Sequence, residues 1–141
     1  MPASRHRHSF IVPFGDCDPA GLVFYPNFYV WMDEATWTLF RSVGITRTVI
    51  NQTYRAMGFP LVSSSLEHRA PVHDGDTLTV ESAVCRWGTS SFDVAHSFTC
   101  DGRPIAEGRE TRVWAVMSDE DGVTVKAAPV PDDVKALLVA S

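Results

Sequence analysis

The sequence predicts an α+β domain in which an antiparallel sheet of five or six strands wraps one long helix. Residues 27–42 contain neither glycine nor proline and place apolar residues at helical spacing. Most of the chain after residue 60 alternates apolar and polar residues, which is the period of a β-strand. Asp-Gly pairs lie between these alternating runs and favour hairpins over β-α-β crossovers. One α+β domain over residues 1–141 follows.

The chain is expected to begin with a strand and a loop. The apolar run His8–Phe14 forms the strand, and Pro13 limits it because proline has no N–H to donate to a neighbouring strand. Residues 15–21 contain two glycines and a proline, a composition typical of a loop.

The long helix is predicted to start at Tyr25–Pro26 and to stop at Gly44. Proline fits the first helical position because its missing N–H would be unpaired there anyway, and glycine is the usual residue just past a helix end. Apolar residues cover most of the helix circumference, so other structure must surround it. Its two apolar faces are formed by Phe28, Trp31, Ala35 and Leu39, and by Tyr29, Met32, Thr36 and Phe40.

The remaining elements are a weakly helical stretch, several strands and a short final helix. Residues 45–57 are expected to be helical or irregular, and alternation predicts strands over 77–84, 91–98 and 112–117. Asp-Gly pairs at 74–75, 101–102 and 121–122 predict hairpin turns, because type I′ turns need positive φ. Residues 132–139 form the last helix. Since such a sheet has open edges, we expect pairing with a second copy.

Composition excludes several classes of function. Twelve lysines and arginines against seventeen acidic residues give a net charge of −5, which disfavours binding to nucleic acid or anionic membranes. The longest uncharged run, Pro19–Met32, is too short and too interrupted to span a bilayer. The three cysteines form no Cys-x-x-Cys pair, so we expect reduced thiols in a cytoplasmic protein. The histidines show no metal-ligand spacing, and no metal site is predicted.

The candidate catalytic residues lie in the segment Phe14–Asn27. It places Asp16 and Asp18 in a glycine-bounded loop just before a helix N-terminus. Unpaired N–H groups and the helix dipole stabilise negative charge on an oxygen there, while a carboxylate attacks a carbonyl or activates water. This arrangement suits acyl transfer; the alternative is that both aspartates only shape and cap the loop. Cys17 is a weaker candidate nucleophile, since no histidine lies near it in sequence.

This segment resembles the signature of the 4-hydroxybenzoyl-CoA thioesterases of the hotdog-fold superfamily. The resemblance extends over most of the chain, and it implies a hotdog fold and hydrolysis of an aromatic or short acyl-CoA without a cofactor. It also implies a homodimer or homotetramer. The residues that carry it are the two aspartates with Cys17 between them, Pro19-Ala20-Gly21, Tyr25-Pro26-Asn27, Trp31, Asp33, Ala35 and, more loosely, Pro60-Leu61-Val62-Ser63 and the strands to Trp114.

The resemblance assigns roles to four residues. Asp18 is the catalytic carboxylate, as nucleophile or general base, and Tyr25 offers its backbone N–H to the thioester carbonyl. Asp16 shapes the loop, with its side chain capping nearby amides. Asp33 either recognises a hydroxyl group of the substrate or is a polar residue that faces solvent or another subunit.

Two departures from the family pattern concern substrate binding. The turn expected to bind CoA, from Arg86 through Gly88, Thr89 and Ser90, has one charged residue where the family has a basic run, so backbone amides replace those side chains. Phe59 stands where a smaller polar residue is usual and shapes the acyl pocket towards an apolar group. Two other functions remain: a hotdog module that binds acyl-CoA without turnover, and a hotdog dehydratase, which needs a histidine that the chain lacks between His8 and His68.

Overall fold

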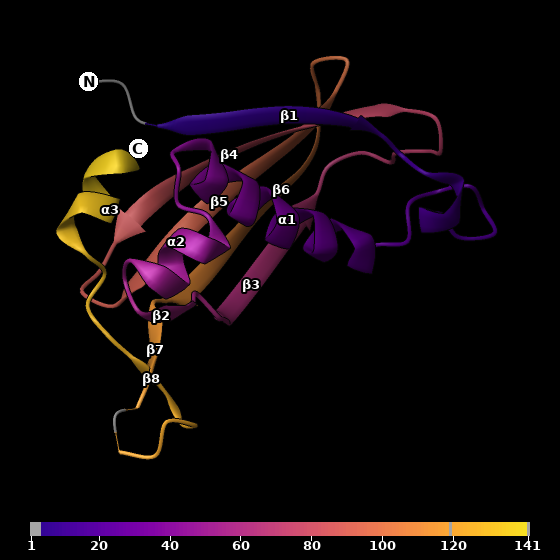
Figure 1. The fold of residues 1–141 in the computed structure, drawn as a ribbon. Helices are drawn as coiled ribbons and strands as arrows, with labels where there is room; N and C mark the ends of the chain where they lie inside the picture. Colours follow the sequence, from indigo (N-terminus) through magenta and orange to yellow (C-terminus); the bar gives the residue numbers. More distant parts are fainter. Residues whose placement is uncertain (1–3, 119, 141) are drawn as a thin grey trace.

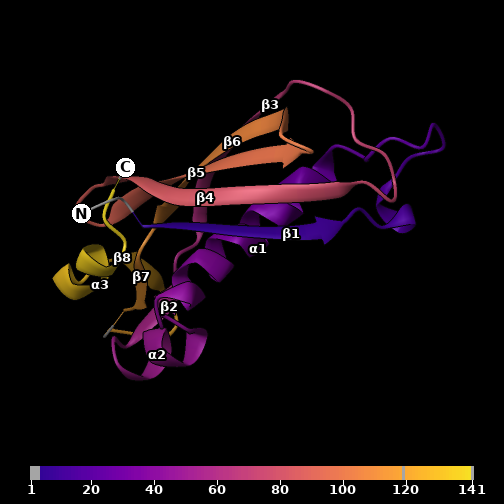
Figure 2. The ribbon, with the colours of Figure 1, turned by 90° about the horizontal axis from the view of Figure 1, so that it is seen from above.

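In the computed structural model, which describes residues 4–118 and 120–140, one long helix lies on one face of a five-stranded sheet (Figures 1 and 2). All neighbouring strands are antiparallel, which confirms the α+β prediction. The sheet order is β1 (Arg5–Ile11), β4 (Thr77–Trp87), β5 (Ser91–Cys100), β6 (Arg103–Val113) and β3 (Leu61–His68).

Helix α1 (Pro26–Ser42) begins where the sequence predicts, with Pro26 at its first position and Tyr25 as N-cap. The helix packs on the sheet through one face, formed by Phe28, Met32, Ala35, Thr36, Leu39 and Phe40. Tyr29 and Val30 stay exposed, at 37% and 63%. The sheet therefore covers one side of the helix, and part of its apolar surface is left uncovered in one protomer.

A smaller three-stranded sheet, β2-β7-β8, lies at one end of the long helix. The predicted strand over 112–117 is divided at Trp114, whose N–H donates to the Ser90 carbonyl and whose side chain is buried. This change of direction sends the chain from β6 into the smaller sheet. The remaining elements are η1 (Phe14–Asp16), α2 (Arg47–Gln52), β2 (Ala56–Gly58), β7 (Ala115–Met117), β8 (Val125–Ala127) and α3 (Asp132–Leu137).

The three Asp-Gly pairs have different outcomes. Asp101 and Gly102 have φ of 52° and 76° and join the paired strands β5 and β6, which confirms that hairpin. The pair at 121–122 lies in the longer connection between paired strands β7 and β8. The hairpin predicted at 74–75 is wrong: β3 pairs with β6 and β4 pairs with β1, so the turn links strands that are not neighbours. Gly75 instead donates its N–H to Val12 at the end of β1.

The core lies between α1 and the large sheet and continues under the smaller sheet. Met32, in the middle of α1, is fully buried against Gly108 of β6, where a Cβ atom would collide with the Met32 sulfur. This glycine permits the close approach of helix and sheet. Among the described residues, no helix has the length and apolar content needed to cross a bilayer.

We therefore predict that Gly108→Val lowers the free energy of unfolding by about 1–3 kcal/mol, because the added side chain must displace Met32 and Leu66 from a packed interior. Urea denaturation measures the change. Gly15→Ala is the control, since a Cβ atom there meets nothing within 4 Å. Equal stability of the Gly108→Val variant and the parent protein would contradict this account of the packing.

Candidate active site

The loop before α1 is closed by Asp18. Its Oδ1 accepts hydrogen bonds from the N–H groups of Ala20 (2.9 Å) and Leu22 (3.3 Å), and its own N–H donates to the Leu22 carbonyl (2.8 Å). Its second carboxylate oxygen has no hydrogen-bond partner among the described residues. Asp18 is half-buried. The same side chain therefore orders the loop with one oxygen and keeps the other available.

Asp16 acts differently from the prediction. Its backbone carbonyl accepts from the Phe24 N–H (2.9 Å) and from Asn27 Nδ2 (2.8 Å), whereas its carboxylate bonds to no described residue. The capping of nearby amides expected of Asp16 is done by Asp18. The reason is that η1 turns the Asp16 carbonyl towards the helix start, where Asn27 is within reach.

Cys17 is poorly suited to be a nucleophile. Burial and the nearby carboxylate of Asp74 raise the pKa of its thiol, so the thiolate is disfavoured at neutral pH. The sulfur lies 3.8 Å from the Pro13 carbonyl. These observations count against the alternative in which Cys17 attacks the substrate.

The helix start offers one free backbone donor. Pro26 has no N–H, while Asn27 and Phe28 donate to the Phe24 and Tyr25 carbonyls. The Tyr25 N–H has no acceptor among the described residues and lies at the positive end of the helix dipole. Tyr25 also lines an apolar pocket of about 210 Å³ together with Leu22, Val23, Phe28, His68, Ala70, Pro71 and Val72.

Asp33 and Phe59 lie close to each other, away from the Asp18 loop and Tyr25, and Arg112 binds both. Asp33 is eight residues beyond Tyr25, which separates them by about 12 Å along the helix axis. Its Oδ1 accepts from Arg112 Nη2 at 2.7 Å, and Arg112 Nη1 donates to the Phe59 carbonyl at 3.1 Å. A pocket of about 470 Å³ lies here, lined by Trp37, Arg47, Met57, Gly58, Phe59, Pro60, Arg112, Ala115 and Val125.

Behind Asp33 runs a buried polar network that the sequence analysis missed. Glu110 accepts from Arg112 Nη2 (2.7 Å) and from Thr36, and it lies 2.9 Å from His96 Nε2. The other ring nitrogen of His96 lies 2.7 Å from Ser82 Oγ. Because an ionised carboxylate only accepts, Nε2 carries the proton in this arrangement.

A signal for this network was present in the sequence. Strand alternation places His96 on the same face as Val94 and Phe98, which are buried. The same period puts Glu110 and Arg112 on the inward face of the next strand. Charged residues at inward positions of adjacent strands must pair with each other to remain buried.

Glu110 and Arg112 remain charged at neutral pH. Burial alone would raise the pKa of Glu110, but hydrogen bonds from His96 and Arg112 outweigh it and lower that pKa to about 2. Burial opposes the charge on Arg112 as well, yet Glu110 and Asp33 raise its pKa. The two buried charges cancel, so Asp33, whose side chain is 59% exposed, presents a negative charge at the surface.

The turn predicted to bind CoA lies far from the Asp18 loop. Gly88, Thr89 and Ser90 connect β4 to β5 beside α3, where Lys135 Nζ donates to the Gly88 carbonyl at 2.9 Å. The loop lies at the opposite end of β4 (Figure 1), a strand of 11 residues and roughly 35 Å. One protomer thus keeps apart the three groups of residues that the sequence analysis assigned to one site. No cluster of three or more metal-ligating side chains occurs among the described residues.

Residues 12–138 match the model of the thioesterase-like superfamily, and the chain belongs to that superfamily. It is 32% identical to the 4-hydroxybenzoyl-CoA thioesterase of Pseudomonas sp. (strain CBS-3) over 130 residues, which cover 86% of this chain and 89% of that one. It is 28% identical to the 1,4-dihydroxy-2-naphthoyl-CoA hydrolase of Synechococcus sp. (strain WH7803), over 92% of this chain and 86% of the relative.

Solved structures agree with this membership and confirm the hotdog fold. The structure of the Pseudomonas 4-hydroxybenzoyl-CoA thioesterase superposes with a TM-score of 0.87 at 30% identity, covering 96% of this chain and 99% of that one. A gentisyl-coenzyme A thioesterase superposes with a TM-score of 0.79 at 33% identity, covering 94% and 98%.

The Glu110 pair predicts how stability depends on pH. Because folding lowers the pKa of Glu110 from 4.5 to about 2, its contribution is complete above pH 4.5 and is lost as the pH falls towards 2. We expect Glu110→Gln to reduce the slope of unfolding free energy in this window by up to about 1.4 kcal/mol per pH unit.

Urea unfolding at several pH values between 6 and 2.5 gives this slope. The exposed carboxylate of Glu67 supplies the control, and Glu67→Gln is expected to keep the parental slope. If Glu110→Gln showed the parental slope as well, the carboxylate of Glu110 would not be held ionised by its partners.

Proposed function

We propose that this protein hydrolyses the thioester of a hydroxylated aromatic acyl-CoA. The observation that carries the proposal is the loop in which Asp18 keeps one unbonded carboxylate oxygen and which leads directly to the free N–H of Tyr25. The chain belongs to the thioesterase-like superfamily. The named relatives act on 4-hydroxybenzoyl, 1,4-dihydroxy-2-naphthoyl and gentisyl thioesters, and each of these acyl groups carries a phenolic hydroxyl on an aromatic ring.

In the proposed reaction, the Tyr25 N–H donates a hydrogen bond to the thioester oxygen, where negative charge develops. The free oxygen of Asp18 either attacks the carbonyl carbon or removes a proton from a water that attacks it. In the first route CoA thiolate leaves from a mixed anhydride, which water then hydrolyses. In the second route the thiolate leaves directly. Both routes consume one water and release the free acid and CoA.

Asp33 is proposed to accept a hydrogen bond from the phenolic hydroxyl of the substrate. Arg112 binds only one of its carboxylate oxygens, and the side chain is exposed. Phe59 lines the neighbouring pocket, where we propose that the acyl ring binds. It is only 2% exposed, and its ring packs at a tilt against Trp37, which lines the same pocket, with centroids 4.2 Å apart.

The active enzyme is proposed to be a homodimer or homotetramer. In one protomer Asp33 and the Gly88–Ser90 turn lie away from the Asp18 loop, so a second copy must bring them together. Strand β3 is an edge of the large sheet, and Leu61 and Val62 on it are 51% and 63% exposed, which suits pairing with another copy. We also propose a cytoplasmic location, because a reducing compartment keeps cysteines as free thiols.

The alternative is a module that binds acyl-CoA without hydrolysing it. A binder does not need a half-buried carboxylate beside a helix start. Assays of hydroxybenzoyl-, benzoyl-, phenylacetyl- and short-chain acyl-CoA with a thiol reagent decide between the two. Release of CoA from at least one substrate supports the enzyme, and binding of all four without release supports the module.

We predict that Asp18→Asn lowers kcat by roughly 10²–10⁴-fold while KM stays within a few fold, because the amide can still accept from Ala20 and Leu22 but cannot act as base or nucleophile. Steady-state release of CoA measures the effect. Asp74→Asn, which changes an exposed carboxylate close to the same loop, is the control and should keep parental turnover. Parental turnover in Asp18→Asn would refute the role of Asp18.

We predict that Asp33→Asn reduces the preference for 4-hydroxybenzoyl-CoA over benzoyl-CoA by about 10-fold, since a charged acceptor strengthens the hydrogen bond to a phenol. The ratio of the two kcat/KM values is the measurement. Glu34→Gln serves as control: Glu34 is the next residue on the helix, and its carboxylate pairs with Arg41. An unchanged ratio in Asp33→Asn would leave Asp33 with a structural role.

A further inference from the structure

Two arginines from different strands share one carboxylate on the sheet face that points away from α1. Asp93 of β5 accepts from Arg86 Nε (2.9 Å) and Nη2 (3.2 Å), and from Arg109 Nη2 (2.6 Å). Thr111 Oγ1 adds a fourth hydrogen bond at 2.8 Å. Arg86 lies on β4 and Arg109 on β6, so the three charges cross three adjacent strands. We call Arg86, Asp93 and Arg109 the arginine cluster.

The arginine cluster is a cationic surface with unused donors. Its net charge is +1, because the hydrogen bonds from Arg86 and Arg109 lower the pKa of Asp93 well below its usual range. Asp93 itself is 8% exposed, while the arginine side chains are 44% and 55% exposed. Nη1 of Arg86 and both Nε and Nη1 of Arg109 have no acceptor among the described residues. Nη1 of Arg86 lies beside Gly88, and hydrogen bonds to Asp93 already hold both guanidinium groups in place.

The cluster adjoins the turn assigned to CoA. A Cβ atom on Gly88 would lie 2.8 Å from Arg86 Nη1 and 2.9 Å from Ser91 Oγ, so only glycine lets the guanidinium rest against the turn. The Thr89 and Ser90 carbonyls accept from Val130 and Trp114 and fix the turn. The N–H groups of Thr89 and Ser90 have no acceptor among the described residues, which leaves two more donors for an anion.

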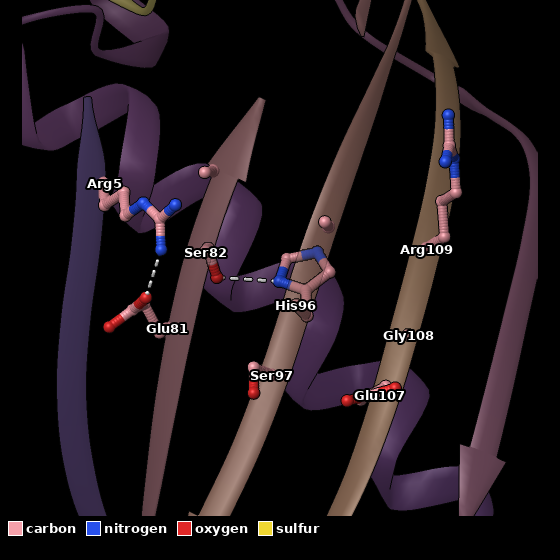
Figure 3. A pocket seen from close by; sticks show the side chains of 10 residues that line it. Arg5, Glu81, Ser82, His96, Ser97, Glu107, Gly108 and Arg109 are labelled. Atoms are coloured by element: carbon pink, nitrogen blue, oxygen red, sulfur yellow. Dashed lines mark hydrogen bonds and ion pairs between the residues drawn. The ribbon is translucent and has the colours of Figure 1, made fainter. Parts of the chain in front are cut away.

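A pocket of about 370 Å³ extends from Arg109 over the same face. Figure 3 shows Arg5 and Arg109 on opposite sides of this pocket, with helix α1 behind the strands. Its floor includes Ala83 and Ala95, two small side chains. Its carboxylates are paired with arginines: Glu81 is bound by Arg5 and Arg7, and Glu107 shares Arg69 with Glu67.

We propose that the arginine cluster binds a phosphate group of the CoA moiety, with Arg86 and Arg109 as ligands and Asp93 as the residue that positions them. The inference rests on the proposed function, because acyl-CoA supplies the phosphates. Guanidinium groups match phosphate oxygens with paired N–H donors, and two of them balance a dianion better than one. Arg109 thereby supplies charge that the Gly88–Ser90 turn lacks, and the adjoining pocket leaves room for the nucleoside.

Kinetics of Arg109→Gln with three thioesters of one acyl group test this proposal. The thioesters are those of CoA, of dephospho-CoA, which lacks the 3′-phosphate, and of pantetheine, which lacks the whole nucleotide. With the CoA thioester we expect KM to rise about 10-fold or more while kcat stays within about twofold. With the pantetheine thioester we expect no effect of the substitution.

Two further variants sharpen the comparison. Gly88→Ala displaces the Arg86 guanidinium without removing its charge, and it should raise KM for the CoA thioester but not for the pantetheine thioester. Arg41→Gln removes an exposed arginine that pairs with Glu34 on α1, on the other side of the sheet from the arginine cluster, and it should leave all three KM values unchanged.

The dephospho-CoA thioester identifies the phosphate. If the Arg109→Gln effect disappears with it, the cluster binds the 3′-phosphate; if the effect persists, the cluster binds the diphosphate. An unchanged KM for the CoA thioester, or an equal rise with the pantetheine thioester, would overturn the proposal.

Failure of the proposed function would be seen separately, as no hydrolysis of any thioester by the parent protein. In that case calorimetry with CoA itself still tests the cluster: a Kd about 10-fold weaker in Arg109→Gln supports it, and an equal Kd overturns it.

Discussion

The buried ion pair between Arg112 and Glu110 is the constraint on which the rest of the structure depends. Neither charge can be left unpaired between the helix and the sheet, because an isolated buried charge costs several kcal/mol. Their partners come from every layer: Thr36 and Asp33 from α1, His96 from β5 and the Phe59 carbonyl before β3. Buried pairs of this kind add little net stability, but Thr36 and Asp33 bind this pair from two points along α1. The pair therefore fixes where α1 lies along the strands.

The position of α1 in turn fixes the proposed site. Because a helix is rigid over two turns, Tyr25 at its start and Asp33 further along keep a constant separation of about 12 Å. The Asp18 loop is tied to the same helix start through the hydrogen bonds of Asp16 to Phe24 and Asn27. The Asp18 loop and Asp33 are therefore held at a set distance by one helix, and in the proposed oligomer a second copy of that helix completes the site.

Local features were predictable from the sequence, and features that depend on strand pairing were not. Pro26 marked the helix start and Asp101-Gly102 marked a hairpin, because each is decided by the backbone of neighbouring residues. Asp74-Gly75 carried the same local signal, yet β4 pairs with β1 and the predicted hairpin does not form. The roles of Asp18 and Tyr25 came from a resemblance and stay predictions. Strand alternation puts His96, Glu110 and Arg112 on inward faces, but which of them meet, and which arginines share Asp93, depends on the register of β4, β5 and β6, which no local pattern reveals.

In the proposed CoA site, the positive charge that the Gly88–Ser90 turn lacks comes from arginines on the neighbouring strands. A basic side chain on a flexible turn loses rotamer freedom when it binds a phosphate, and that loss weakens binding. Arg86 donates to both oxygens of Asp93 and Arg109 donates to one of them, so both arginines have already lost part of this freedom. The carboxylate lowers the net charge by one but holds two guanidinium groups side by side. Fewer and better-ordered cations can thus replace a run of mobile ones, provided that the strands bring them together.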